Sequence, residues 1–495
     1  MATKTFDATP SASMLIESLR DIGYSLETAL ADIIDNSITA QAENIELFAD
    51  ISDADHRIGI VDDGTGMSEQ VLHDAMRPGS RNPLDIRPRS DLGRFGLGLK
   101  IASFSQCRRL TVATRHEGIT SAAIWDLDFV AERNKWLVQI PEQLAAIPWI
   151  SHLGESGTLV IWEKLDRLVE PATSGDMLPY ITRRIDETRE HLELVFHRFL
   201  TGERGLKKVH LSLNGRQLVP FDPFHIDHAA TICGPVEKIR VTGQEVVMQA
   251  FTLPHHQKVT PAEWERFAGR AGYLKNQGFY VYREKRLIIH GTWFGLARQM
   301  ELTKLARVRI DIPNGLDAQW KIDVKKSTAQ PPYRVRERLR RIIEEIGLNS
   351  KRVYTARGRK LTADNRLPVW NRIQDKNEIT YRINSEHPVI VDFISKLPEE
   401  LKRDFSHVLE ITGSALPMDA LFADMGGAPE KVSGNLPTDD ALQYAVKTTA
   451  KRLIDMGGNR EEIPDMLKLA EPFRSNWKRT EEILAETLSV EVSGE

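Results

Sequence analysis

Cysteine is scarce in this chain of 495 residues, which contains only Cys107 and Cys233. Two cysteines exclude a disulfide framework and a cysteine-based structural zinc site, and they favour a reducing compartment. The sequence also lacks the run of about 18 apolar residues that a transmembrane helix needs, and its first residues lack the basic and apolar blocks of a signal peptide. We therefore expect a soluble, cytoplasmic protein with no membrane partner.

An excess of positive charge is absent as well. The 66 lysines and arginines face 70 aspartates and glutamates, so the net charge is −4. No global positive field therefore attracts nucleic acid, and any such surface must be local. Hydrophobic residues are 41% and charged residues 27% of the chain, which is typical of globular proteins, and the length predicts about three domains.

The hydrophobic patterns predict an α+β fold. A first domain over residues 1–200 begins with two helices within 11–41, continues with alternating strands and closes with a helix over 177–200. A second domain over 201–346 contains the strand-turn-strand GFYVYREKRLIIHG, strands in ARVRIDIP and WKIDVKKS, and a closing helix from Tyr333. The third domain, 347–495, is expected to be mainly helical and has no motif that assigns a role.

The first chemical motif is Asp32-Ile33-Ile34-Asp35-Asn36, on a helix that Ser25 is expected to cap. Asp32 and Asn36 are four residues apart and therefore share one helix face. A carboxylate between apolar flanks is costly unless it is solvated, paired or near a metal. On its own, this pentapeptide leaves open whether the face is a ligand site or the wet side of an amphipathic helix.

Two glycine-rich motifs follow. Asp62-Asp63-Gly64-Thr65-Gly66-Met67 comes directly after a predicted strand, where glycines let the backbone approach a ligand. Gly93 to Lys100 has the spacing GxxGxG, which can present backbone N–H groups to phosphates. It follows no strand and lacks the GK[ST] ending, so it is neither a dinucleotide fingerprint nor a P-loop. The unpatterned stretch 77–98 is expected to be a functional lid.

In this order, and followed by Gly157-Thr158 before the strand LVIW, the motifs resemble those of the GHKL ATPases: gyrase B, heat-shock chaperone, histidine kinase and MutL. The resemblance implies a Bergerat-type α/β sandwich that hydrolyses ATP with Mg²⁺. It implies that Asp32 is the catalytic acidic residue and Asn36 the magnesium ligand. It also implies an adenine site formed by Asp62, Gly66, Met67 and Thr158. A phosphate site is implied at Gly93, Gly96, Gly98 and Lys100.

One departure from the family concerns Asp32, because most hydrolytic members carry glutamate there. Aspartate is one methylene shorter, and a general base must first have the right geometry. The predicted nucleotide site is unaffected, but a nucleotide-binding switch with little turnover remains an alternative to an active ATPase.

The second domain resembles the S-five-like transducer domains of gyrase B, MutL and the MORC proteins. These send a cation to the γ-phosphate, and we predict Lys326 as the second catalytic residue, with Lys325 next. Residues 282–287 also resemble a MutL strand-turn-strand, without its Asn-Gly. The phrases AMRPGSRNP and GTLVIWEKL look most like MORC and prokaryotic MutL-like ATPases of restriction and phage-defence operons.

The resemblance therefore implies a homodimeric, ATP-gated clamp on DNA or on a partner complex, in defence or in DNA restriction or repair, with operon-encoded defence proteins as candidate partners. In relatives the segment before the first motif crosses to the partner, so Met1–Arg20 is the expected dimer arm. A chaperone-like remodelling ATPase is the alternative. A histidine kinase is disfavoured because no phosphoacceptor helix precedes the motifs.

Two further clusters lie outside these motifs. His255-His256 has no third ligand at metal spacing, so we predict no metal site there. Residues 333–360 carry ten basic residues against three glutamates. This local excess is compatible with a DNA-binding surface and equally with a solvated helix face.

Overall fold

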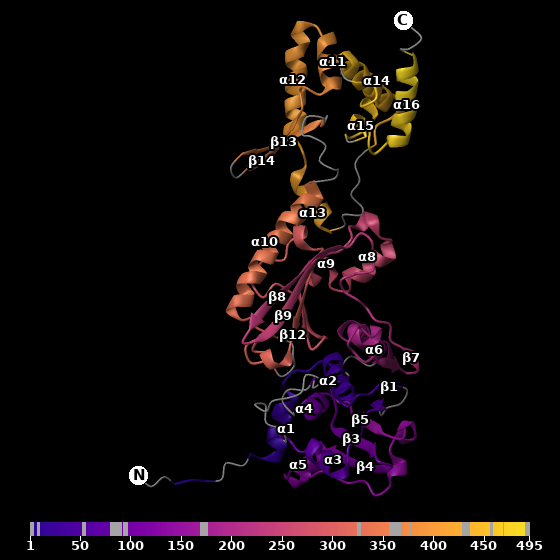
Figure 1. The fold of residues 1–495 in the computed structure, drawn as a ribbon, viewed down its shortest axis with the longest axis vertical. Coiled ribbons are helices and arrows are strands. Elements are labelled where there is room, and N and C mark those ends of the chain that lie inside the picture. Colours follow the sequence, from indigo (N-terminus) through magenta and orange to yellow (C-terminus); the bar gives the residue numbers. More distant parts are fainter. Residues whose placement is uncertain are drawn as a thin grey trace. The chain divides into compact units, whose positions relative to one another are not determined.

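The computed structural model describes residues 4–6, 10–51, 56–79, 92, 98–168, 177–323, 328–355, 368–375, 378–427, 436–455, 459–468 and 470–490. The chain divides into two compact units, residues 1–349 and 350–495 (Figure 1). The first unit contains two large sheets and all the predicted site residues. Within the described residues, no helix combines the length and apolarity that crossing a membrane requires.

The first sheet has seven strands in the order β4-β3-β5-β2-β1-β6-β7. Neighbours are antiparallel except β1 and β6, which are parallel, so the sheet is mixed. Its strands are β1 (Asn44–Asp50), β2 (Arg57–Asp62), β3 (Arg109–His116), β4 (Ile119–Asp126), β5 (Gly157–Glu163), β6 (His210–Leu213) and β7 (Arg216–Gln217).

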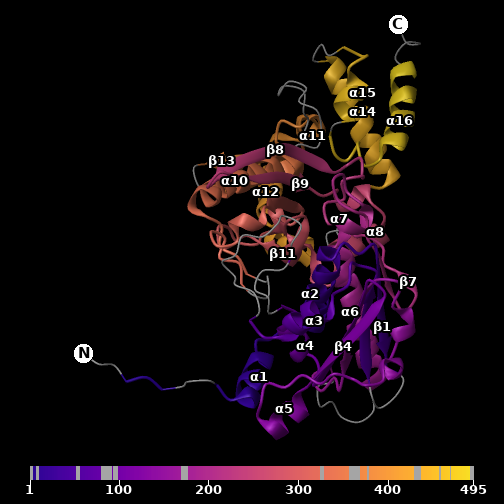
Figure 2. The same ribbon diagram turned by 60° about the horizontal axis from the view of Figure 1, so that its bottom comes forward.

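Both faces of this sheet are covered. Alternate residues of a strand point to opposite sides, and on β2 Ile58 and Ile60 pack into the core under the helices, whereas Val61 joins a second cluster beneath residues 144–153. Figure 2 shows the helices beside the strands. They are α1 (Ala12–Arg20), α2 (Leu26–Thr39), α3 (Glu69–Met76), α4 (Gly98–Phe104), α5 (Leu127–Arg133), α6 (Met177–Val195) and α7 (His197–Thr201). This is the predicted α/β sandwich.

The second sheet has the order β11-β10-β12-β9-β8, with β10 and β12 parallel. The long helix α10 (Tyr333–Thr355) runs along it (Figure 1) and buries Val335, Leu339, Ile342 and Ile346, spaced at helical intervals. The other elements are β8 (Ile232–Val241), β9 (Gln244–Thr252), α8 (Pro261–Ala268), α9 (Gly272–Asn276), β10 (Gly278–Arg283), β11 (Arg286–Thr292) and β12 (Ala306–Ile312).

The two sheets share apolar packing. Tyr280, Tyr282 and Leu287 of the second sheet belong to the same buried cluster as α2, α4 and α6. Consequently, strands β10 and β11 are held against the helical layer of the first sheet.

The prediction of a strand in WKIDVKKS is wrong for its described part, Trp320–Asp323. Lys321 has φ of 47°, which breaks an extended backbone, and the N–H of Ile322 donates to the carbonyl of Asp317 in a turn. The following residues, 324–327, lie outside the described residues.

The second unit is mainly helical, as predicted, but it also contains a hairpin that the sequence patterns did not indicate. Leu442, Val446 and Phe473 are fully buried in its core. The elements are β13 (Trp370–Asp375), β14 (Glu378–Ile383), α11 (Pro388–Lys396), α12 (Glu399–Ser414), α13 (Met418–Gly427), α14 (Asp439–Asp455), α15 (Ile463–Leu467) and α16 (Trp477–Val490).

Candidate nucleotide-binding site

The first motif lies in the middle of α2. The helix is preceded by Ser25, whose backbone N–H donates to Thr28 Oγ1 (3.1 Å) in a capping box. Asp32 is 5% exposed and Asp35 1% exposed, whereas Asn36 is exposed. Asp32 is therefore a buried carboxylate at the edge of the core, and Asn36, one turn later, presents its amide to solvent.

Tyr24 holds the carboxylate of Asp32. Its hydroxyl donates to Asp32 Oδ2 (2.9 Å), and the pair is buried. Burial, reinforced by the Asp32 charge, raises the pKa of Tyr24 far above its ordinary value, so the tyrosine remains a donor at neutral pH. The sequence patterns did not single out Tyr24, which directly precedes the predicted cap, Ser25.

The start of α4 approaches the same carboxylate. A Cβ on Gly98 would lie 3.8 Å from Asp32 Oδ2. The predicted phosphate-binding segment therefore ends beside the predicted catalytic residue, and the structure brings these two sites together.

Asp62 ends β2 and is 7% exposed. Its Oδ2 accepts from the Ser37 hydroxyl (2.7 Å), and its Oδ1 accepts from the backbone N–H groups of Gly64 (3.0 Å) and Thr158 (3.2 Å). Burial raises the pKa of Asp62, although these three donors oppose the shift. Each carboxylate oxygen has two lone pairs, so Oδ2 retains capacity for one further donor, such as an amino group.

Gly66 is required by close packing. It has φ of +64°, and a Cβ there would collide with the carbonyl oxygen of Arg115 on β3. Gly157 is equally constrained, against the carbonyl of Asp62. Met67, which follows Gly66, donates its N–H to Thr114 Oγ1 (2.9 Å). The glycine-rich turn is thereby fastened across β3 and β5, next to Asp62.

Thr114 joins the predicted Thr158 to this turn. Its hydroxyl donates to the carbonyl of Gly157 (2.9 Å) and lies 3.4 Å from Thr158 Oγ1. Sequence reasoning missed Thr114 and Ser37. Ser37 directly follows the first motif, which is a local signal, whereas Thr114 is one residue within an ordinary alternating strand.

Part of the predicted lid lies outside the described residues, including Gly93 and Gly96. Leu92 is described and is buried. Its N–H donates to Thr39 Oγ1 of α2 (3.2 Å), and its carbonyl accepts from Arg283 Nη1 of β10 (2.9 Å). Arg283 is itself fixed by Asp317 (2.8 Å). Leu92, directly before Gly93, is therefore anchored by helix α2 and by strand β10.

Lys100 has a different environment from the predicted one. Its ammonium donates to the backbone carbonyls of Ala75 (2.7 Å) and Arg77 (3.0 Å) near the end of α3, and the residue is buried. In this arrangement it fastens α4 to α3. A contact of Lys100 with phosphates stays a prediction.

The second sheet reaches the first motif through Arg286. Its Nε donates to Asp35 Oδ1 (3.2 Å), and the two side chains are 8% and 1% exposed. Arg286 also packs its guanidinium over the ring of Phe196, 5.4 Å from the centroid. The residue next to Asn36 is thus paired with a residue of β11.

Lys325 and Lys326 lie outside the described residues, but their flanks are described. The N–H of Thr328 donates to Asp323 Oδ1 (2.9 Å), and that of Asp323 donates to the Thr328 carbonyl (3.3 Å). The charge of Asp323 also contributes to the raised pKa of Tyr24. Asp323 therefore lies within electrostatic range of the tyrosine that holds Asp32.

Comparison with known proteins agrees with this geometry. Residues 24–156 match the family model of the histidine kinase-, DNA gyrase B- and HSP90-like ATPases. A segment of 92 residues is 32% identical to the DNA mismatch repair protein MutL of Bradyrhizobium diazoefficiens. That alignment covers 18% of this chain and 15% of the MutL chain, so the chain matches only a small part of this relative's length.

Proposed function

We propose that the protein is a Mg²⁺-dependent ATP hydrolase, since residues 24–156 match the family model of the histidine kinase-, DNA gyrase B- and HSP90-like ATPases. The observation that carries this proposal is the grouping of Asp32, held by Tyr24, with the start of α4 at Gly98. A buried carboxylate beside a phosphate-binding helix start is suited to accept the proton of an attacking water.

In the proposed mechanism, Asp62 recognises the base. Its Oδ2 accepts one hydrogen bond from the adenine amino group, while Ser37, Gly64 and Thr158 fix the carboxylate. Gly66 and Met67 flank the adenine site, and Thr158 contacts the base through water. Because the carboxylate is already oriented before nucleotide binds, little ordering is needed on binding.

The residues present fit magnesium. Asn36 offers an exposed amide oxygen, which suits a hard cation that keeps most of its ligands as water and phosphate oxygens. Within the described part of the chain, no group of three or more His, Cys, Asp or Glu residues could hold a metal ion. When bound, the ion neutralises phosphate charge.

The hydrolysis proposal is tested by Asp32→Asn, which keeps the side-chain volume and removes the base. ATP affinity should persist, while turnover falls by about 10²- to 10⁴-fold. The matched control is Asp74→Asn on α3, whose carboxylate is exposed, and which should leave both unchanged. Equal turnover in wild type and Asp32→Asn would refute the assignment of Asp32, and Asp32→Glu shows whether the shorter side chain limits the rate.

We further propose that ATP closes a homodimeric clamp, with Lys326 reaching the γ-phosphate. The charge of Asp323, three residues before Lys326, contributes to the raised pKa of Tyr24, and this nearness of Asp323 to the tyrosine that holds Asp32 supports the proposed role of Lys326. Sedimentation with a non-hydrolysable ATP analogue should show dimers that Lys326→Ala weakens and that ADP does not produce. An unchanged mass in all nucleotide states would refute gating, and loss of closure in Lys325→Ala alone would transfer the role to Lys325.

A deletion that tests the predicted dimer arm must leave helix α1 intact. Ala12, Ile16 and Arg20 are buried in this chain's own core, and Arg20 donates to the carbonyl of Phe104 (2.8 Å). Phe6, by contrast, is 88% exposed. We therefore propose that residues 1–10 of the predicted arm cross to the partner subunit. Their deletion should weaken dimers without unfolding the domain.

We propose DNA as the substrate of the clamp, contacted by α10. Arg338 is paired with Glu237 and Arg340 with Glu337, but Arg334 and Arg341 are exposed and have no ion pair among the described residues. Replacing both by glutamate should weaken DNA binding and flatten its salt dependence. Arg340→Glu is the control, because Glu337 already offsets that charge. Unchanged DNA binding in the double variant would leave the chaperone-like alternative.

A further inference from the structure

Arg283 is the last residue of β10, and its side chain is 3% exposed. Its Nε and Nη2 donate to the two carboxylate oxygens of Asp317 (2.8 and 2.9 Å), while its Nη1 donates to the backbone carbonyl of Leu92 (2.9 Å). A guanidinium is planar and carries its donors in a rigid fork. One rigid group therefore sets the position of Leu92 relative to Asp317.

Leu92 is held on its other side by the first domain. Its N–H donates to Thr39 Oγ1 of α2 (3.2 Å), and its side chain is buried. In the sequence, Leu92 directly precedes Gly93, the first glycine of the motif that is predicted to bind phosphates. Arg283 therefore fixes the residue that leads into the predicted phosphate-binding motif.

Asp317 belongs to the segment that leads to the predicted Lys326. Its backbone carbonyl accepts from the N–H of Ile322 (3.3 Å), which closes a turn. The hairpin between β10 and β11 holds the start of the same segment, because Glu284 Oε1 accepts from the N–H of Asn314 (2.9 Å). The end of β10 and the hairpin turn thus fix the described residues that precede Lys326 in the sequence.

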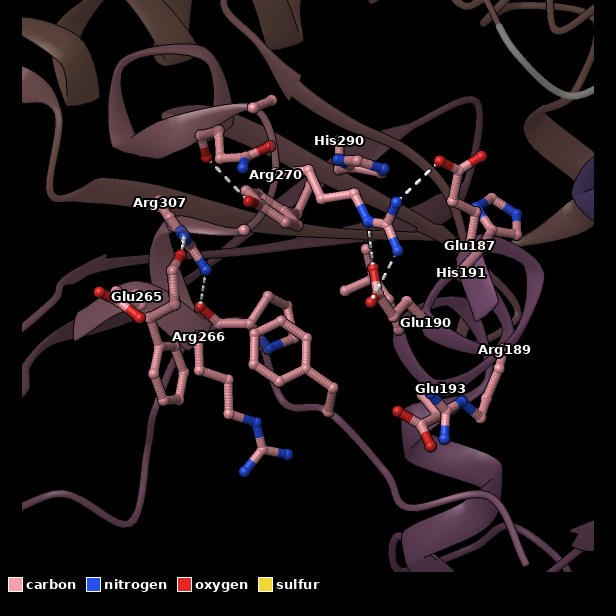
Figure 3. A pocket seen from close by; sticks show the side chains of 18 residues that line it. Glu187, Arg189, Glu190, His191, Glu193, Glu265, Arg266, Arg270, His290 and Arg307 are labelled. Atoms are coloured by element: carbon pink, nitrogen blue, oxygen red, sulfur yellow. Dashed lines mark hydrogen bonds and ion pairs between the residues drawn. The ribbon is translucent and has the colours of Figure 1, made fainter. Parts of the chain in front are cut away.

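A second arginine has the same arrangement of donors at a different place. Arg270, between α8 and α9, donates through Nε and Nη2 to Glu190 (2.8 and 3.1 Å) and through Nη1 to Glu187 (2.7 Å), both on α6 (Figure 3). The cavity that Arg270 lines contains none of the residues predicted to bind nucleotide. Both arginines join the second domain to the first, but of these two it is Arg283 that contacts a residue next to a nucleotide motif.

We propose that Arg283 is a positioning residue that makes the nucleotide site prefer ATP over ADP. This inference rests on the proposed function, because it takes the glycine motif and Lys326 as the groups that hold the γ-phosphate. Arg283 holds the residues that lead into both segments before nucleotide binds, so less ordering is needed when ATP binds. ADP lacks the γ-phosphate, so its binding depends less on how the two segments are placed.

The test is Arg283→Lys, which keeps a positive charge beside Asp317 but replaces the fork by a single ammonium. The full chain is titrated calorimetrically with a non-hydrolysable ATP analogue and with ADP. Wild type should bind the analogue more tightly than ADP, and the variant should bind the analogue about tenfold more weakly, as expected for one lost charge-assisted hydrogen bond, with little change for ADP.

Two matched controls separate this role from a structural one. Arg270→Lys changes the same fork away from the nucleotide motifs. Arg198→Lys changes an arginine that is also 3% exposed and that pairs with Asp311 of β12 across the same two domains. Both variants should keep the wild-type ratio of ATP-analogue to ADP affinity.

A measurement without nucleotide tests the positioning itself. Hydrogen exchange resolved to the Leu92 amide should be faster in Arg283→Lys than in wild type and unchanged in both controls. The double variant Arg283→Met with Asp317→Leu replaces the buried pair by apolar side chains, so it should remain folded in thermal melts and should also lose the preference for the ATP analogue.

The outcomes distinguish this inference from the proposed function. If wild type binds neither nucleotide, the proposed function fails, and this inference fails with it. If wild type prefers the ATP analogue but Arg283→Lys keeps that preference, or if both controls lose it equally, the role of Arg283 is overturned while the proposed function stands. Unchanged exchange of the Leu92 amide in Arg283→Lys would also overturn it.

Discussion

The buried pair of Arg286 and Asp35 is the most direct link between the second sheet and the predicted catalytic helix. Replacing Arg286 by methionine keeps much of the apolar stem over Phe196 but removes the charge. Asp35, 1% exposed, would then be left buried with its arginine partner gone. At 3.2 Å and an effective dielectric constant of about 20, the lost attraction is about 5 kcal/mol before desolvation is counted.

Because removal of one partner of a buried pair typically costs about 3–5 kcal/mol, we expect Arg286→Met to destabilise the first unit by about 3 kcal/mol. Asp35→Asn should relieve part of this loss when combined with it, giving a coupling energy of about 1–3 kcal/mol in the double-mutant cycle. Hydrogen exchange of peptides from residues 1–349 in urea measures this unit separately from the second one.

The same variants report on function. Asp35 adjoins Asn36, so Arg286→Met should also reduce ATP turnover, and the double variant should recover part of the stability without recovering full turnover. Lys396→Met, which breaks an exposed pair with Asp392 in the second unit, is the control and should cost about 0–1 kcal/mol. If the losses of the two single variants simply add, the pair contributes no coupling and the reasoning fails.

Two other predictions concern the adenine site. Burial raises the pKa of Asp62 above its ordinary 3.8, so as the pH falls Asp62 should take up a proton, and ATP binding should weaken, at a higher pH than for an exposed aspartate. The protonated carboxyl stabilises the fold in acid, and this contribution to stability is lost as the pH rises through the pKa of Asp62. Fluorescent-nucleotide titrations across pH should show the step in wild type and not in Asp62→Asn, which should bind ATP more weakly throughout. Gly66→Ala should destabilise the domain more than Gly79→Ala in thermal melts, because both residues have positive φ but only Gly66 would collide with a carbonyl.

Local pattern was sufficient for much of the first domain. The bounds of α2 follow from its cap and its apolar spacing. Ser68, a residue type that commonly caps helices, accepts from the N–H of Val71 at the start of α3. The resemblance in motif order also predicted that Asp32 and Gly98 belong to one site, and the structure places them side by side. These features depend on residues close together in sequence, or on a family fingerprint in which each motif carries its own glycines.

The contacts that hold the site were not predictable in this way. Arg286 and Asp35 are 251 positions apart, and Arg283 and Leu92 are 191 apart. Nothing in the periodicity of either segment names its partner, because the contact exists only after the two sheets pack. The hairpin of β8 and β9 was missed for another reason. Strand β8 is largely exposed and carries little apolar pattern, although Thr242-Gly243, with φ of 46° and 82°, is a hairpin turn signal.

Tyr24 is where the local and the long-range parts of the site meet. It precedes α2, donates to Asp32, and lies in the field of Asp323 beside the predicted lysine segment. Tyr24→Phe removes one hydrogen bond to a charged group, worth about 1.5–3 kcal/mol, so turnover should fall about 10- to 100-fold if that bond orients the base. KM for ATP should change little, because the Tyr24 hydroxyl bonds Asp32, whereas the adenine site is assigned to Asp62 and its neighbours. Tyr180→Phe, a partly buried tyrosine with no side-chain hydrogen bond among the described residues, should leave turnover unchanged. A loss of ATP affinity with unaltered turnover would instead place Tyr24 in nucleotide binding.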